Sequence, residues 1–192
     1  MVFHPCFFMP KESDMKQNTL HKKSLNLLFF ITLLLFYQGV SIASEALSNI
    51  RQADHPSTPI ETLTALAKDS DAAVRIAIAM NRRTPVTTLE LLAHDENVDV
   101  RIAVCTNLST NQKTLGILAH DKDVSVRSVV ARFEYVSAEV LATMANDKDA
   151  DIRYEVARNW NTDIKTLELL SKDDFEEVRN MAMRSLADRA KQ

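Results

Sequence analysis

The apolar positions after residue 43 recur with a period of 26 residues through five copies. A leucine opens the apolar stripe of every copy, at Leu63, Leu89, Leu115, Leu141 and Leu167. A second apolar position follows three residues later, at Leu66, Leu92, Leu118, Met144 and Leu170. A β-branched residue returns at Val74, Val100, Val126, Ile152 and Val178. Columns that keep one register over every copy indicate a repeat protein.

Each copy predicts two short helices. We expect the first to begin at Thr58-Pro59, with the threonine as N-cap and the proline at the first helical position. Glu61 follows Thr58 at capping-box spacing. The second helix should begin at an N-cap that recurs as Asp71, Asn97, Asp123 and Asp149. Such a unit cannot bury its apolar stripe alone, so the pattern predicts an all-α solenoid of about five 26-residue repeats over residues 44–192.

Residues 1–43 have a different character. The segment from Leu25 to Tyr37 carries no charge, Lys22 and Lys23 precede it, and Ser41-Ile42-Ala43 follows it. A charged start, an apolar middle and a small-x-small ending predict a secretory signal peptide cut before residue 44. Met15 is a possible true start. Export to the periplasm or secretion follows if the segment is cleaved. If it is not, residues 25–43 are close to the ~20 residues of a spanning helix and would make a membrane-tethered adaptor.

Composition narrows the function. The chain of 192 residues has two glycines, so a glycine-rich phosphate loop cannot be written. Its two cysteines, Cys6 and Cys105, cannot form a disulfide framework or a cysteine-rich metal site. A net charge of −3 argues against broad nucleic-acid binding. No Ser/His or Cys/His grouping is legible, so we expect neither an enzyme nor a cofactor.

Three repeated polar features invite functional interpretations. An arginine recurs at Arg75, Arg101, Arg127, Arg153 and Arg179, four residues after the predicted N-cap in the first copy. We expect it to pair with Asp71 at i,i+4 spacing, or with acids and carbonyls of the next repeat, rather than to bind anions. His94 and His120 occupy equivalent positions, and Asp69 and Asp71 form a repeated Asp-x-Asp. We predict a solvated face and N-caps here; a metal-dependent accessory protein is the alternative.

The repeat phrase STP-x-x-x-L-x-x-LA-x-D-x-D-x-x-VR, as it stands in residues 57–75, resembles the leucine-rich repeat variant family. That family is similar in style to HEAT and armadillo repeats. The resemblance implies a right-handed superhelix in which α-helices alternate with shorter 3₁₀-like helices, and a scaffold that binds other macromolecules. The cysteines that hold an iron–sulfur cluster in some members are missing. Asn111 and Val136-Ser137 depart from the Thr-Pro of the phrase.

Positions that break the repeat predict a binding surface. The residues one and five after the repeated arginine share a helix face and vary widely, from apolar in the early copies to aromatic and basic in the later ones. By analogy, second helices often line the concave side of such stacks. Ordinary surface variation is the alternative. We predict an exported, non-enzymatic scaffold that binds a protein or extended peptide through Ile76, Met80, Ile102, Arg132, Tyr154, Arg158, Trp160 and Arg184.

Overall fold

The computed structural model describes residues 32–34, 36–41 and 43–191. The chain divides into two compact units, Met1–Leu47 and Ser48–Gln192. All described residues of the first unit are helical. Most of the predicted signal segment, including Met15, lies outside the described residues. Within the described ranges, no helix is long and apolar enough to cross a membrane.

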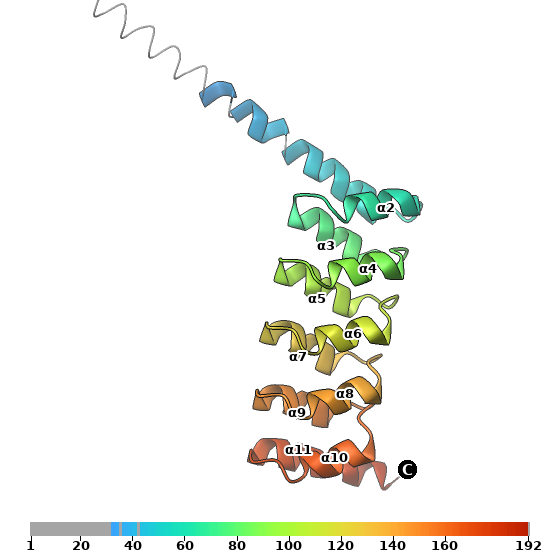
Figure 1. Ribbon diagram of the computed structural model, residues 1–192, viewed down its shortest axis with the longest axis vertical. Helices are drawn as coiled ribbons and strands as arrows, with labels where there is room; N and C mark the ends of the chain where they lie inside the picture. The colour runs from blue at the N-terminus through green and yellow to red at the C-terminus, as the bar shows by residue number, and fades with distance from the viewer. Residues whose placement is uncertain (1–31, 35, 42, 192) are drawn as a thin grey trace, which may run out of the picture. The chain divides into compact units, whose positions relative to one another are not determined.

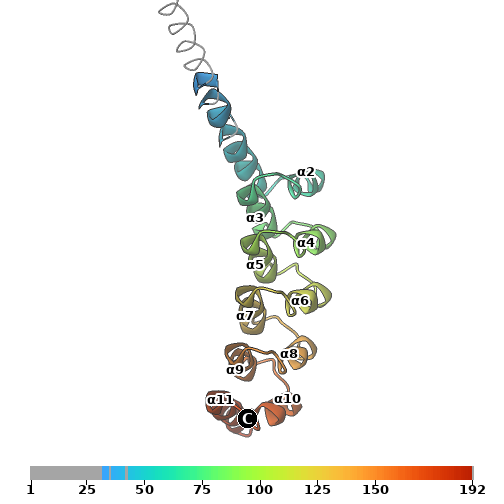
Figure 2. The same cartoon turned by 60° about the vertical axis from the view of Figure 1, so that its left-hand side comes forward.

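The second unit is a row of helix pairs (Figure 1). The even-numbered helices form one layer and the odd-numbered helices the other, and a turned view keeps the two layers apart (Figure 2). This arrangement confirms the predicted all-α repeat architecture. The helices are α2 (Ile60–Leu66), α3 (Ala72–Met80), α4 (Val86–Leu92), α5 (Val98–Thr106), α6 (Gln112–Leu118), α7 (Val124–Arg132), α8 (Ala138–Met144), α9 (Ala150–Arg158), α10 (Ile164–Leu170) and α11 (Glu176–Arg189).

The core runs without interruption between the two layers. Leu63 and its equivalents at Leu89, Leu115, Leu141 and Leu167 are fully buried. The Val74 column of the second helices is buried against them. Helical residues 48–54 extend this core at its start through Ala53, which is fully buried at the position equivalent to Ala79. Each helix therefore stabilises its neighbours mainly by sharing one apolar stripe.

The starts of the first helices differ from our prediction. Pro59, not Thr58, immediately precedes the first helical residue, and its side chain caps nothing. The Thr58 hydroxyl instead donates to the carbonyl oxygen of Gln52, in the preceding helical segment. The amide of Thr58 donates to the carbonyl oxygen of His55, so the capping box predicted with Glu61 does not form. The expected roles of the threonine and the proline were wrong.

The threonine has a different structural purpose. The Thr84 hydroxyl donates to the Ile78 carbonyl oxygen at 2.6 Å, and Thr110 and Thr162 repeat the contact. Helix carbonyls near a C-terminus have no partner within their own helix. A buried threonine thus bonds to a carbonyl at the end of the preceding second helix, for α3, α5 and α9. Val136, which has no hydroxyl, interrupts this column.

Of two further predictions about the helices, one is confirmed and one is wrong. Asp71, Asn97, Asp123 and Asp149 do cap the second helices, as predicted, each accepting a bond from an amide two residues later. The short first helices, in contrast, are α-helical rather than 3₁₀-like. They close with i→i+4 bonds, such as the one from the Leu63 amide to the Pro59 carbonyl oxygen, and tighten only in the last turn. The apolar stripe of a 3.6-residue period requires this geometry.

Candidate functional site

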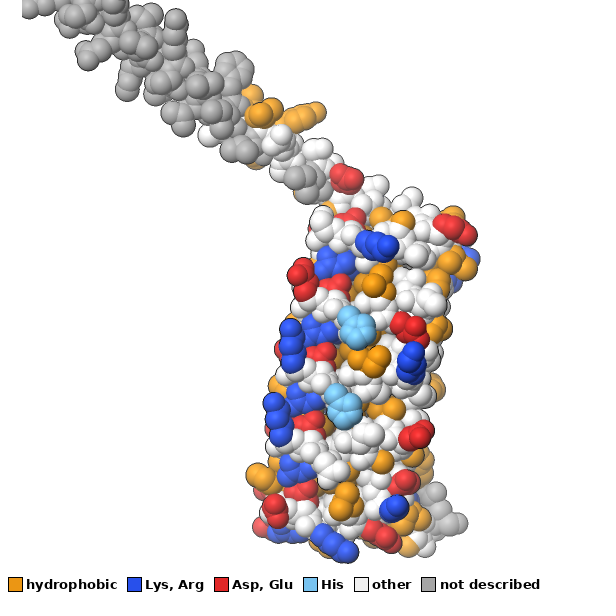
Figure 3. Space-filling model, viewed as in Figure 1, with side chains coloured by type: hydrophobic (Ala, Val, Ile, Leu, Met, Phe, Trp, Pro, Cys, Tyr) orange, Lys and Arg blue, Asp and Glu red, His pale blue; other side chains and the backbone are white. Residues whose placement is uncertain are grey.

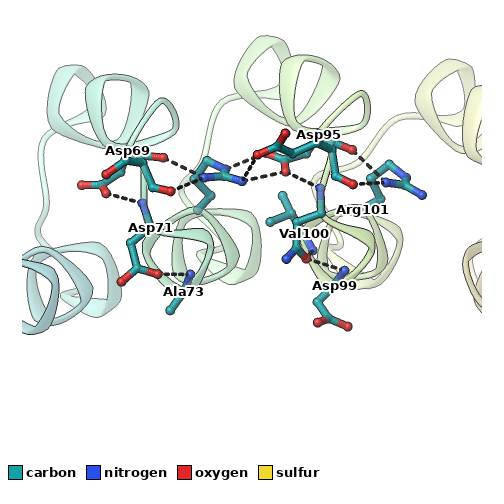
Figure 4. A network of polar contacts seen from close by, with 11 residues as sticks. Asp69, Asp71, Ala73, Asp95, Asp99, Val100 and Arg101 are labelled. Carbon is teal, nitrogen blue, oxygen red and sulfur yellow. Dashed lines mark hydrogen bonds and ion pairs between the residues drawn. The ribbon is translucent and has the colours of Figure 1, made fainter. Parts of the chain in front are cut away.

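The repeated arginines form a ladder of buried ion pairs between successive repeats (Figure 4). Arg75 Nε lies 2.7 Å from Asp95 Oδ2, and its Nη2 lies 2.9 Å from Asp95 Oδ1. The pairing with Asp71 that we expected is wrong, because Asp71 is occupied as an N-cap. The expectation that the arginine reaches the next repeat is confirmed. The same geometry recurs in the pairs Arg101–Asp121, Arg127–Asp147 and Arg153–Asp173.

Each arginine of the ladder also donates to backbone carbonyl oxygens in the loop between the two helices of its own repeat. Arg75 Nη1 donates to the carbonyl oxygens of Asp69 at 2.8 Å and Ser70 at 3.1 Å, which follow the end of α2. At the start of the ladder, Asn49 stands in the arginine position and donates to Asp69 at 2.9 Å. At the other end, Arg179 makes carbonyl contacts to Asp173 and Asp174, without a carboxylate partner among the described residues. Because the guanidinium groups of Arg75, Arg101, Arg127 and Arg153 each bond to a carboxylate and to carbonyl oxygens, these arginines are structural, as predicted.

The ladder should make stability fall in acid. Burial raises the pKa of Asp95, but hydrogen bonds from Arg75 and from the Asn97 amide outweigh it and hold that pKa below its ordinary value. The same balance lowers the pKa of Asp121, and the Arg153 bond lowers that of Asp173. A lowered folded-state pKa stabilises the charged form, so this stability is complete above about pH 4 and is lost below it. Urea unfolding at stepped pH should show the decline; a flat profile from about pH 4 down to pH 2 would contradict the prediction.

A second ladder, of asparagines, escaped the sequence analysis. Asn107 Nδ2 donates to the carbonyl oxygens of Ala79 at 2.6 Å and Asn81 at 3.0 Å, in the preceding repeat. Asn81 and Asn159 make equivalent bonds, and the Ser185 hydroxyl takes their place in the last repeat. The signal was present, because asparagine recurs at the 26-residue step. Phe133, which has no donor side chain, interrupts it.

The candidate metal positions form no metal cluster. His94 and His120 are exposed, and Figure 3 shows two histidines on one face of the second unit. Among the described residues, no group of three or more His, Cys, Asp or Glu side chains is placed to hold a metal ion. The thiol of Cys105 is fully buried, and burial raises its pKa to about 12. Cys6 lies outside the described residues. Cys105 therefore serves as a small core residue, as predicted from its column.

Most of the predicted partner-binding residues gather at two adjoining hollows. The first hollow, of about 620 Å³, is lined by Arg132, Glu134, Glu155, Arg158, Asn159, Trp160 and Asn161. The second, of about 460 Å³, is lined by Tyr154, Arg158, Asn159, Trp160, Met181, Arg184, Ser185, Asp188 and Arg189. The two hollows share three residues, Arg158, Asn159 and Trp160. We call Arg132, Tyr154, Arg158, Trp160 and Arg184 the basic–aromatic surface.

The other three predicted residues lie elsewhere. Ile76 and Ile102 are half-buried and pack against the core, as Tyr154 of the same column also does. Met80 is 62% exposed but lines a separate hollow in the first repeat, with Arg82 and Arg83. The structure therefore brings the aromatic and basic residues of the predicted site together and places its apolar residues elsewhere.

The basic–aromatic surface is held by contacts around Trp160. The Trp160 ring is 66% exposed, and the guanidinium of Arg189 lies over it, 5.8 Å from the ring centroid. Arg189 also donates to the carbonyl oxygens of Trp160 at 2.7 Å and of Thr162. Arg158 Nη1 lies 3.5 Å from Glu155 Oε2, in an ion pair on α9. The sequence did not point to Arg189, since it lies at the end of α11 with no equivalent in earlier repeats.

The fold and its two ladders define an α-helical repeat protein. A solved structure that is similar to this chain is described as a leucine-rich repeat variant with a novel repetitive protein structural motif. The two are 27% identical over 68% of this chain and 65% of that chain, with a TM-score of 0.36. This chain thus spans less than two thirds of that structure. The match names the family that the repeat phrase resembles. A scan of protein-family models and a search of curated proteins found no match.

Proposed function

We propose that the protein is an exported, non-enzymatic scaffold that binds a protein or extended peptide through the basic–aromatic surface. One observation carries the proposal. Arg132, Arg158 and Arg184 come from three different repeats, yet they line two hollows that meet at Trp160. Tyrosine, tryptophan and arginine are the residue types that most often supply binding energy at interfaces.

The surface combines exposed contact groups with a rigid base. Arg132, Arg158 and Arg184 are exposed, whereas the helices beneath them are fixed by the arginine and asparagine ladders. Pre-organised contact groups lose little conformational entropy on binding, which favours affinity. Export rests on the apolar segment from Leu25 to Tyr37 and the small residues before position 44. The tethered alternative shares the same binding surface and differs only in retaining residues 25–43.

A crosslinking experiment tests the proposal. The full chain, carrying a photo-crosslinker at position 184 or, as control, at Lys113 on α6, is expressed in living cells. The intact mass of the recovered protein gives its first residue, which should be Ser44. Position 184 should capture a specific species that position 113 does not.

Variants then measure its affinity. Tyr154→Ala and Arg158→Ala should each weaken binding of the captured species about 30-fold, because each removes an anchor worth about 2 kcal/mol. Arg158→Ala should unfold at the temperature of the parent, because Arg158 is exposed, whereas Tyr154→Ala should unfold at a lower temperature, because Tyr154 packs against the core. The exposed Lys113→Ala serves as the matched control and should bind normally. Equal affinity for all three variants would place recognition on another face.

A further inference from the structure

The exposed arginines of the basic–aromatic surface are spaced by the repeat itself. Arg132, Arg158 and Arg184 occupy the same column in three successive repeats. Helix α9 packs directly against both α7 and α11 (Figure 2). Axes of packed helices lie about 8–10 Å apart. The surface therefore offers one guanidinium per step of about 8–10 Å along the stack.

This step matches one peptide conformation best. A polyproline II helix has three residues per turn with a rise of about 3.1 Å, so every third side chain returns to the same face after about 9 Å. Same-face side chains of a β-strand recur at about 6.6 Å, which is too short for one repeat. An α-helix reaches the step only at every seventh residue, after about 10.5 Å.

The aromatic residues of the surface favour the same conformation. Trp160 is 66% exposed and fixed beneath the Arg189 guanidinium, and the half-buried Tyr154 lines the same hollow. Aromatic-lined grooves accept the rings of polyproline II ligands, which lose little entropy on binding because they are already extended. An α-helical ligand would not place proline rings against these aromatic side chains.

The charges of the basic–aromatic surface indicate which side chain the ligand should carry at every third position. The two hollows are lined by four arginines and three acidic residues, Glu134, Glu155 and Asp188. Glu155 is paired with Arg158. Among the described residues, the side chains of Arg132 and Arg184 make no hydrogen bond or ion pair, so both guanidinium groups are available. Each can bind a carboxylate with two parallel hydrogen bonds.

We infer that the partner segment is an acidic polyproline II stretch with a carboxylate at every third residue, each facing one arginine of the column. The inference rests on the proposed function and specifies its ligand. The ligand chemistry is that of a Pro-x-Glu repeat rather than of a generally acidic surface.

Two synthetic peptides of the same composition test the inference. One carries Pro-Pro-Glu triplets, which place all glutamates on one face; the other carries the same glutamates consecutively, which spreads them over three faces. In fluorescence titrations at low salt, the spaced peptide should bind at least about tenfold more tightly. Arg132→Gln and Arg184→Gln should each remove most of this preference. Lys113→Gln, with a similar exposed charge, should keep it.

Two results would overturn the inference: equal binding of the two peptides, including no binding of either, or tighter binding of a helical peptide with glutamates seven residues apart. The crosslinking experiment separates this failure from failure of the proposed function. A species captured from position 184 that depends on Tyr154 would leave the function standing. Equal capture from positions 113 and 184 would remove both.

Discussion

Arg127→Ala should lower the free energy of unfolding by about 4 kcal/mol, because it removes one partner of a buried ion pair in the arginine ladder. The Arg127 and Asp147 side chains are 5% and 8% exposed, and their Nε–Oδ2 distance is 2.8 Å. Truncation leaves the Asp147 carboxylate buried without its counter-charge. It also frees the carbonyl oxygen of Asp121, which accepts from Arg127 Nη1 at 2.9 Å. Urea unfolding followed by circular dichroism measures the change.

The end of the ladder supplies the matched control. Arg179 donates to the carbonyl oxygens of Asp173 and Asp174, and within the described part of the chain its guanidinium has no carboxylate partner. Arg179→Ala should therefore cost only about 1 kcal/mol, the usual value of a hydrogen bond. Adding Asp147→Asn to Arg127→Ala should recover part of the loss, since the buried charge is then removed. Equal losses for Arg127→Ala and Arg179→Ala would show that the buried carboxylate is not the source of the effect.

Asn107→Ala should destabilise the protein by about 2–3 kcal/mol, through the unpaired buried carbonyls that it leaves. Asn107 is 4% exposed, and its amide donates to Ala79 and Asn81. Its side-chain oxygen accepts from the Ser109 amide at 2.8 Å, so the substitution also releases the loop before α6. Denaturant unfolding gives the loss, and hydrogen exchange should show faster exchange at Ser109.

The control for this prediction is Asn146→Ala. Asn146 is exposed and belongs to a different column of the repeat. Its substitution should change the free energy of unfolding by no more than about 0.5 kcal/mol, as for most surface changes. If Asn107→Ala and Asn146→Ala behaved alike, the asparagine ladder would contribute shape but not stability.

Local features of the repeat could be predicted from the sequence, whereas contacts between repeats were predicted for the arginine as one of two options and were missed for the threonine. The Asp71 N-cap depends on an amide two residues away, so spacing alone reveals it. The Thr58 hydroxyl and the Arg75 guanidinium instead find partners in the preceding segment and in the following repeat. Both residues also fit a familiar local motif, a helix cap and an i,i+4 pair. For Thr58 this motif hid the contact with the preceding segment, whereas for Arg75 the sequence left the next repeat open as a partner.

The candidate site shows the same division. Arg132, Arg158 and Arg184 come together because they share a column, and a column can be read from the sequence. Ile76 belongs to the neighbouring column, where side-chain variation did not reveal partial burial against the core. Arg189 fixes Trp160 from beyond the last repeat, where no register exists to indicate it.

Phe133 and Val136 have a mechanical consequence. They occupy the asparagine and threonine positions of one repeat, so Phe133 cannot donate to the carbonyls at the end of α5 and Val136 cannot donate to the Val130 carbonyl at the end of α7. At this joint Gln112 connects the loops of the other layer, donating to the Tyr135 carbonyl oxygen at 2.8 Å and accepting from the Ser137 amide at 2.8 Å. The stack is thus an elastic rod of uneven stiffness. Under tension along its axis, we expect the C-terminal ends of α5 and α7 to separate first, because Phe133 leaves this pair without the asparagine bond found between α3 and α5 and between α7 and α9.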